Sequence, residues 1–473
     1  MIREQSAIWG AISSYFKIEE RGSTIGTEIR AGVAAFLTMS YNLLVNPQLM
    51  SQAGVPAQDV VVATAAASAC ASLAVGILGN LPFGMAPGMG LSAYLVFGLV
   101  LSGNITRVQA LTSCLISGAL LLLVTLTGVS KLLMSLTPHH IKLAIVVGMG
   151  LLVSLIGMVQ VDLVVSSGDA SLVALGDLTD WKIWLVLAGL LLIGSLTHHQ
   201  VKGGILIGIF ASTITYWGVT GDWPERFVKY PELQDTLQDN IDFCTLDRHC
   251  ILPIVAFLFV ALFDVSGVMF GLGALGRLQK EDGTIPGGTW GFLGSGAGTI
   301  LAAMGGCSPI IVQVENAAGI REGGRTGLTA VVVGLLFTSA LFLAPLFGEI
   351  PSCATAPVLI LVGAMMTNES KNIDWTNMKE ALPAFLCLAM MPFTYSIPNG
   401  ILFGLTFSFA FFITSGEIFE FLRPGERTNR RPSFIDSEPT LHHPTLVVSS
   451  AEAASIPDHL PSYGAVAQTG TTV

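Results

Sequence analysis

Long apolar stretches recur along the chain from Ala31 to Thr414, and short polar segments separate them. Typical examples are VVVATAAASACASLAVGIL (60–78) and LTAVVVGLLFTSALFLAPLF (328–347). A helix needs about 20 predominantly apolar residues to cross a bilayer, and about 14 stretches meet or approach that length. The pattern therefore predicts an all-α polytopic membrane protein with about 14 transmembrane spans.

Two of these stretches are interrupted by glycine and proline. They are LPFGMAPGMGLSAYL (81–95) and GGCSPIIVQVENAAG (305–319), and each follows a longer apolar span in its own half of the chain. Interrupted spans at matching positions of two halves are typical of transporters built from inverted repeats. Irregular backbone is tolerated at membrane depth only where it is buried in protein or lines a cavity. We therefore expect spans 3 and 10 to meet near mid-membrane, in two inverted repeats of about seven spans each.

Composition and charge support this class of protein. The chain is 52% hydrophobic and 11% charged, whereas soluble domains carry about 25% charged residues. Lysine and arginine gather in alternate loops, and an acid-rich segment lies at 222–247. Because basic loops favour the cytoplasmic side, we expect both termini in the cytosol. Residues 1–23 then form an amphipathic segment at the membrane surface, and the polar residues 423–473 form a disordered cytoplasmic tail.

Two acids inside apolar spans stand out, Asp264 in ALFDVSG and Glu315 in QVENAAG. A carboxylate at mid-membrane costs about 2.5–3.5 kcal/mol on insertion scales, so such acids usually contact a ligand or carry protons. A structural hydrogen bond between spans is the alternative. Glu315 is the stronger candidate because it follows a helix break, whereas Asp264 supports it or hydrogen-bonds backbone amides in the other half.

Further candidates for substrate contact surround the two acids. Backbone amides near Ser92 and Ser308 complete the predicted site, and Phe263 offers a face for stacking on a flat ring. Thr38 and Gln313 are the remaining candidates. The other polar residues of the first and third spans are interpreted as structural, because hydroxyls in helices often bond to their own backbone; they are Ser40, Tyr41, Asn42, Asn46 and Tyr94.

Motifs for other chemistry are missing from the sequence. There is no GxxxxGK[ST] loop, no HExxH or GxSxG pattern and no CxxC pair, so we expect neither an enzyme, nor a cofactor, nor a metal site, nor a nucleic-acid partner. Cys244 and Cys250 lie in a predicted outer loop (219–250). The sequence is compatible with a disulfide between them and equally with two free thiols.

Several long motifs together resemble the AzgA-like purine permeases, in the order and spacing of that family. They are ERGSTIGTEIRAGVAAFLTMSYNLLVNPQLM (20–50), APGMGLSAY (86–94), GGRTGLTAVVVGLLF (323–337), ATAPVLILVGAMM (354–366) and MPFTYSIPNG (391–400). The resemblance implies a core domain (24–128 and 251–348), a gate domain (129–218 and 349–422) and an extracellular loop (219–250). It also implies a homodimer, elevator-like movement, and proton-coupled uptake of adenine, guanine and hypoxanthine, with Asp264 and Glu315 as the acids of spans 8 and 10.

The chain departs from the family pattern around these acids. Ser92 stands where the family usually has asparagine, and valines replace two threonines beside Asp264. The segment after Cys307 has Pro309, Ile311, Gln313 and Asn316 where hydroxyls or tyrosine are common. Losing polar groups that hydrogen-bond the edges of a ligand relaxes or redirects the selectivity of the site.

Three hypotheses follow for a multi-pass protein of the plasma membrane. The first is a secondary active importer of purine bases or a related heterocycle, whose partners are the small molecule, protons, the lipid bilayer and a second copy of the chain. The second keeps the fold but carries another small organic solute or anion. The third is a receptor that binds a ligand without transport and signals through the tail 423–473.

Overall fold

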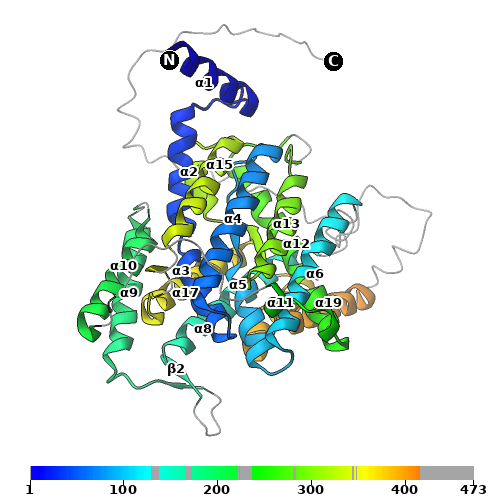
Figure 1. Cartoon of the computed structure of the whole chain (residues 1–473). Coiled ribbons are helices and arrows are strands. Elements are labelled where there is room, and N and C mark those ends of the chain that lie inside the picture. The colour runs from blue at the N-terminus through cyan, green and yellow to red at the C-terminus, as the bar shows by residue number, and fades with distance from the viewer. Residues whose placement is uncertain are drawn as a thin grey trace, which may run out of the picture.

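The computed structural model describes residues 2–128, 138–166, 173–199, 203–221, 237–280, 284–343 and 349–415, together with the single positions 201, 223, 346 and 347. The predicted tail 423–473 and part of the predicted outer loop lie outside the described residues. The described chain is predominantly helical, as Figure 1 shows.

The first half of the chain contains a surface helix and a series of apolar helices. Its elements are α1 (Ile2–Phe16), α2 (Ile25–Met39), α3 (Asn42–Gln52), α4 (Ala57–Gly79), β1 (Met85–Pro87), α5 (Met89–Ala93) continued by a π-helix (Tyr94–Leu101), α6 (Arg107–Leu126), α8 (His139–Gln160), a small hairpin of β2 (Val164–Val165) and β3 (Ala174–Leu175), α9 (Trp181–His198) and α10 (Gly204–Thr220).

The second half repeats this order after a loop with short helical turns. Its elements are α11 (Leu237–Asn240), α12 (Ile251–Leu275), α13 (Thr289–Met304), β4 (Ile310–Val312), α14 (Asn316–Arg321), α15 (Gly327–Ala340), α17 (Ser352–Thr367), α18 (Met378–Thr394) and α19 (Ile397–Thr414). The order of elements α4, β1, α5 and α6 in the first half thus corresponds to the order α13, β4, α14 and α15 in the second. This is the order that two repeats require.

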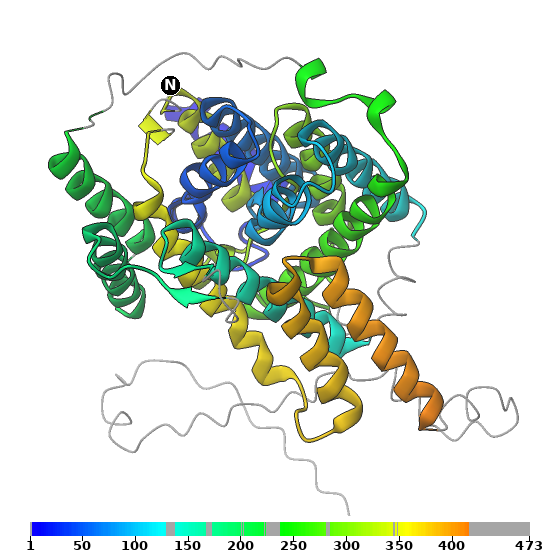
Figure 2. The same ribbon diagram turned by 90° about the horizontal axis from the view of Figure 1, so that it is seen from below.

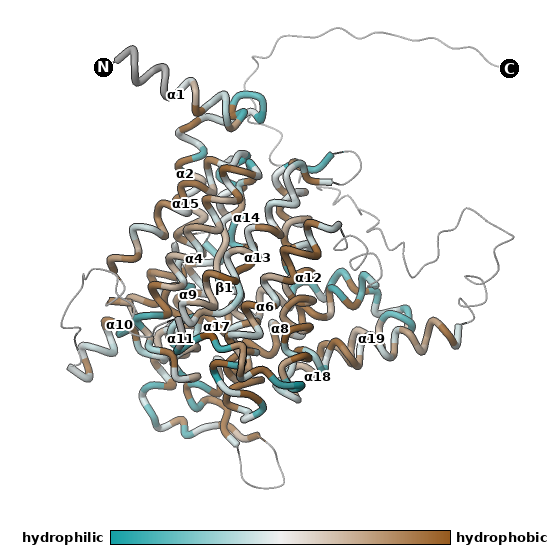
Figure 3. Tube along the Cα trace, turned by 45° about the vertical axis from the view of Figure 1, so that its right-hand side comes forward, coloured by the Kyte–Doolittle hydropathy of each residue, from teal (hydrophilic) through white to brown (hydrophobic). Residues whose placement is uncertain are grey.

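Within the described residues, 6 helices are long and apolar enough to cross a membrane; they are Ala57–Gly79, Arg107–Leu126, His139–Gln160, Trp181–His198, Arg248–Leu275 and Ile397–Thr414. Shorter apolar helices occupy Met89–Leu101, Gly204–Thr220 and Gly327–Leu343. Figure 3 shows hydrophobic colouring along the helices and hydrophilic colouring mainly in the connections between them. The polytopic membrane fold is therefore confirmed, and the count of about 14 spans stays a prediction.

The helices pack in two groups. In one, α4 packs on α13 and α15, α6 packs on α12 and α13, and α2 packs on α14 and α15. In the other, α8 packs on α17 and α18, with α9 and α10 on one flank and α19 on the opposite flank (Figures 1 and 2). Contacts between the groups run mainly from α3, α5 and α12 to α8, α17 and α19. The core and gate boundaries stay a prediction.

A buried acid ties the start of α2 to the start of α15. Glu28 is fully buried. Its carboxylate accepts the backbone N–H of Arg325 at 2.9 Å, the N–H of Thr326 at 3.2 Å and the hydroxyl of Thr329 at 2.6 Å. The first amides of a helix have no partner inside the helix; in α15 the side chain of Asn80 accepts the Gly327 N–H and that of the N-cap Thr326 accepts the Leu328 N–H. Glu28 fixes the segment just before them from a helix far away in sequence.

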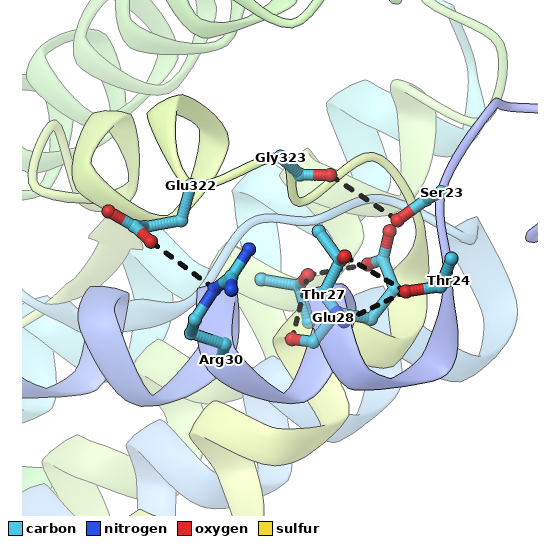
Figure 4. Close-up of polar contacts among 8 residues, drawn as sticks. Ser23, Thr24, Thr27, Glu28, Arg30, Glu322 and Gly323 are labelled. Atoms are coloured by element: carbon cyan, nitrogen blue, oxygen red, sulfur yellow. Dashed lines mark hydrogen bonds and ion pairs between the residues drawn. The ribbon is translucent and has the colours of Figure 1, made fainter.

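A second set of contacts ties α2 to the segment that follows α14. Arg30 forms an ion pair with Glu322 at 3.4 Å, and the Ser23 hydroxyl donates to the Gly323 carbonyl at 3.4 Å (Figure 4). Further along, a Cβ added at Gly319 would lie 2.7 Å from the carbonyl oxygen of Ala31. The two backbones therefore touch, and α2 fixes the position of the short helix α14.

Candidate functional site

The two interrupted segments meet at the centre of the helical body (Figure 3), where β1 and β4 pair antiparallel over all three residues of each. The ladder continues at both ends, because the Gly88 N–H donates to the Pro309 carbonyl at 3.0 Å and the Gln313 N–H donates to the Gly84 carbonyl at 3.4 Å. The expectation that spans 3 and 10 meet is confirmed. An antiparallel crossing is also the arrangement that inverted repeats produce.

Hydroxyl groups from neighbouring helices satisfy the outer edges of this small ladder. Ser72 of α4 accepts the Met85 N–H at 2.9 Å. In the other half, Thr299 of α13 accepts the Ile310 N–H at 3.1 Å, and Ser295 donates to the Ile310 carbonyl at 2.6 Å. Backbone groups in a membrane must find partners within the protein. The matching helices of the two repeats supply these partners at equivalent places.

Two amide side chains bind the two interrupted segments together. Asn316 accepts the Gly84 N–H at 2.7 Å and donates to the Gly84 carbonyl at 2.8 Å. Gln313 donates to the carbonyls of Ala86 at 2.7 Å and Pro87 at 3.0 Å. Both residues are departures from the family pattern, and both bond to the backbone of the facing segment. Gln313 is 6% exposed, and its role toward a substrate stays a prediction.

Glu315 lies at the junction between β4 and α14, as the N-cap residue of that half-helix. One carboxylate oxygen, Oε1, accepts the phenol O–H of Tyr41 at 2.6 Å. The other, Oε2, is buried and has no hydrogen-bond partner among the described residues. An unpaired buried oxygen is costly unless a ligand or water completes it, so the geometry marks Oε2 as an open acceptor.

Asp264 lies on α12, near enough to Glu315 for the two carboxylates to repel each other when both are charged. Both acids are 9% exposed. The expected bonds from Asp264 to freed backbone amides are not present among the described residues, where its carboxylate has no hydrogen bond. Phe263 is buried at 3% exposure and packs at a tilt on Phe259, with 5.7 Å between ring centroids. The two acids therefore form a pair of buried carboxylates that influence each other's charge.

Ser92 and Ser308 are placed side by side, with 2.7 Å between their hydroxyl oxygens. The side-chain oxygen of Asn46 lies 2.8 Å from the Ser92 hydroxyl and 3.1 Å from the Ser308 hydroxyl. Because each hydroxyl has one proton, one serine donates to Asn46 and the other donates to the first serine. Asn46 in turn donates to Thr64 at 3.0 Å and to the Cys307 sulfur at 3.1 Å. Both serines are completely buried, and the network joins three helices to the segment before β4. Their expected role at the substrate stays a prediction.

Two residues near the break of the first span hold Glu315 from outside its own segment. The Thr38 hydroxyl lies 3.2 Å from the Glu315 carbonyl oxygen and 2.8 Å from the carbonyl oxygen of Ala35 in its own helix, so the two carbonyls share its one proton. Tyr41 follows at the turn between α2 and α3. From its sequence position Tyr41 is expected to be structural, and its contact with Glu315 is a finding of the fold. The available signal was a phenol beside a break in an otherwise apolar span, which indicates a polar neighbour but does not identify it.

The remaining sequence expectations concern metals and cysteines. Among the described residues, no group of three or more His, Cys, Asp or Glu side chains is placed to hold a metal ion. Cys244 and Cys250 are free thiols, the first exposed and the second buried. Cys250 contacts Asp247 instead, with the sulfur 3.6 Å from a carboxylate oxygen. Of the two alternatives for the outer loop, the structure therefore has the free thiols.

The fold and the buried carboxylates define a polytopic membrane transporter with its candidate site between two interrupted spans. Sequence comparison agrees with this class. The chain belongs to the permease family Xan_ur_permease, whose sequence pattern matches residues 26–408. This confirms the resemblance found in the motifs at the level of the family, and a permease is a transporter rather than an enzyme.

Individual relatives match nearly as much of the chain. It is 35% identical to a guanine/hypoxanthine permease of Bacillus subtilis over 399 residues, which are 82% of this chain and 92% of the relative. It is 33% identical to an adenine permease of Escherichia coli over 402 residues, which are 85% of this chain and 90% of the relative. Among solved structures, the transmembrane domain of a cyanobacterium bicarbonate transporter, BicA, matches with a TM-score of 0.56 at 16% identity, covering 80% of this chain and 97% of that chain. That likeness concerns the fold alone.

Proposed function

We propose that this chain imports purine nucleobases, namely adenine, guanine or hypoxanthine, or a closely related heterocycle. The observation that carries the proposal is the open acceptor of Glu315, a buried oxygen without a partner between two interrupted spans. Purine rings present N–H and amino donors at their edges, and a carboxylate oxygen is a strong acceptor for such donors. Relatives that are named adenine and guanine/hypoxanthine permeases support the same class of cargo.

Proton symport is the second part of the proposal. Glu315 and Asp264 are nine-tenths buried and lie close to each other. Two ionised carboxylates buried within each other's field destabilise each other. Binding one proton removes this repulsion and lowers the cost of moving the loaded site through an apolar surface. Cargo and proton therefore travel together.

An elevator-like movement is the third part. The β1–β4 pair and its helices α4, α6, α13 and α15 form one packed group, whereas α8 and α17 belong to the other. A rigid core that carries the site past a fixed gate requires such a division. We also propose that the gate forms the homodimer and that the protein works at the plasma membrane.

Uptake of labelled adenine, guanine and hypoxanthine tests the proposal in cells that lack their own purine carriers. Wild type and Glu315→Gln are compared at acidic and neutral pH, with surface abundance measured for each. Glu322→Gln is the matched control, because this acid lies near the far end of the same half-helix in an ion pair with Arg30. We expect pH-dependent uptake in wild type and in the control, and its loss in Glu315→Gln.

Two outcomes would contradict the proposal. If Glu315→Gln retains uptake with unchanged pH dependence, the open acceptor does not bind cargo or protons. If wild-type protein reaches the surface and moves none of the three bases, the substituted polar groups have redirected the site to another solute, or the protein is a receptor. Deleting the tail 423–473 then separates these two, because only a receptor loses its output.

A further inference from the structure

The two oxygens of Glu315 differ in their surroundings. Oε1 lies 2.6 Å from the Tyr41 hydroxyl, within the range of O–H donors bound to carboxylates. Oε2 has no partner among the described residues although it is buried. A carboxylate free to rotate would exchange its two oxygens, so the contact at Oε1 decides which oxygen is left without a protein partner.

Tyr41 is well suited to hold such a contact. Its side chain is 1% exposed, and a phenol has only two side-chain torsions, so packing fixes the hydroxyl at low entropic cost. Tyr41 lies three residues after Thr38, whose hydroxyl reaches the backbone carbonyl of the same glutamate. Residues three apart lie on one face of a helical turn. The end of the first span therefore holds both the backbone and the side chain of Glu315.

We propose that Tyr41 is a positioning residue that occupies Oε1 of Glu315 and so reserves Oε2 for the cargo and for the transported proton. The proposal rests on the proposed function and identifies Oε2 as the atom that contacts the cargo and the proton. When Glu315 is ionised, Oε2 accepts an N–H of the cargo. When a proton arrives from water it bonds to Oε2, which then becomes a donor, while Tyr41 keeps its own proton throughout.

Few other titratable groups face this carboxylate in the described structure. Asp264 approaches from α12 and Tyr41 from the end of α2. The charged residues of α2 and α14, namely Glu28, Arg30 and Arg321, lie toward the ends of those helices away from Glu315. A change in the pH response of Glu315 after loss of the Tyr41 hydroxyl therefore reports on this one bond.

The test uses Tyr41→Phe, which removes only the hydroxyl. The control is Tyr94→Phe, because Tyr94 is likewise buried, at 2% exposure, and packs edge-on to Phe257. Its hydroxyl makes no hydrogen bond in the described structure. In purine uptake, we expect Tyr41→Phe to raise KM about tenfold, the effect of one hydrogen bond to a charged group. Vmax should change less than about twofold, since the missing bond orients bound cargo rather than driving the movement.

A spectroscopic measurement follows the same bond without relying on the cargo. Infrared difference spectra of the purified full-length protein are recorded across a pH titration, and the carboxyl band that disappears in Glu315→Gln is assigned to this residue. A phenol donor stabilises the ionised carboxylate. We therefore expect Tyr41→Phe to shift the band and to move its pH midpoint upward, whereas Tyr94→Phe leaves both unchanged.

The two measurements separate the two proposals. If wild type imports purines and Tyr41→Phe matches Tyr94→Phe in KM and in the spectrum, the positioning role is refuted and the proposed function stands. If no purine is imported but the Glu315 band responds to Tyr41→Phe alone, the purine assignment is wrong and Tyr41 still controls the carboxylate. An unchanged band in Tyr41→Phe overturns the positioning role whatever the cargo is.

Discussion

Replacing Asn316 by alanine removes one of the two amide side chains that join the interrupted spans. Asn316 is fully buried and makes three hydrogen bonds, two with the backbone of Gly84 and one of 2.6 Å to the Gln313 carbonyl. The Gly84 carbonyl keeps a long bond of 3.4 Å from the Gln313 N–H. In Asn316→Ala the Gly84 N–H has no remaining partner among the described residues.

The size of the effect follows from these contacts. A hydrogen bond contributes about 1 kcal/mol net, and a buried donor left without a partner costs about 1–3 kcal/mol. Two lost bonds plus one orphaned N–H therefore amount to about 4 kcal/mol. With an unfolding entropy of about 2.1 cal/mol/K per residue, the 473 residues give about 1 kcal/mol/K. The expected shift is a decrease of about 4 °C in the unfolding temperature.

Thermal unfolding of the detergent-solubilised protein, followed by intrinsic fluorescence at a fixed scan rate, measures this shift. Asn42→Ala is the matched control, because Asn42 is also a fully buried asparagine but makes only a local bond, at 2.9 Å, to the carbonyl of Met39 in the preceding helix. We expect the control to unfold within about 1 °C of wild type. Equal shifts in the two variants would refute the reasoning, since they would mean that the bonds between the repeats add nothing beyond ordinary burial.

Three further predictions concern the helices that hold the site. Gly319→Val should abolish uptake while Gly26→Val does not, because a side chain at Gly319 meets the facing backbone of α2 and one at Gly26 meets open space; uptake normalised to surface abundance measures this. Glu28→Ala should destabilise the protein by about 3–5 kcal/mol, because the N–H groups of Arg325 and Thr326 lose their buried acceptor. Arg30→Ala breaks a largely exposed ion pair and should cost less than about 1 kcal/mol; equal unfolding temperatures would contradict this difference. Thr355→Val removes a 2.8 Å hydrogen bond from α17 to α3, between the two helix groups; it should change Vmax more than KM if that bond breaks during transport, and unchanged kinetics would argue against it.

The local chemistry of the site was only partly predictable from the sequence. Asp264 and Glu315 stand out because a carboxylate in an apolar span is expensive and therefore rare. Ser92 and Ser308 stand out equally as polar residues beside helix breaks, yet the structure places their hydroxyls on each other and on Asn46. A hydroxyl pattern along one span does not specify which partner from another span will meet it.

By itself, the sequence determined the class of protein and the outline of the fold. Apolar length identifies spans because the bilayer has a fixed thickness, and glycine and proline mark interrupted spans because they release backbone bonds wherever they occur. Only the tertiary structure decided that Tyr41 bonds to Oε1 of Glu315 and leaves Oε2 open. Those residues are 274 positions apart, and their contact depends on the rotation and depth of helices packed from both repeats. Hydropathy is a property of each segment alone, whereas a hydrogen bond between segments depends on how they pack together.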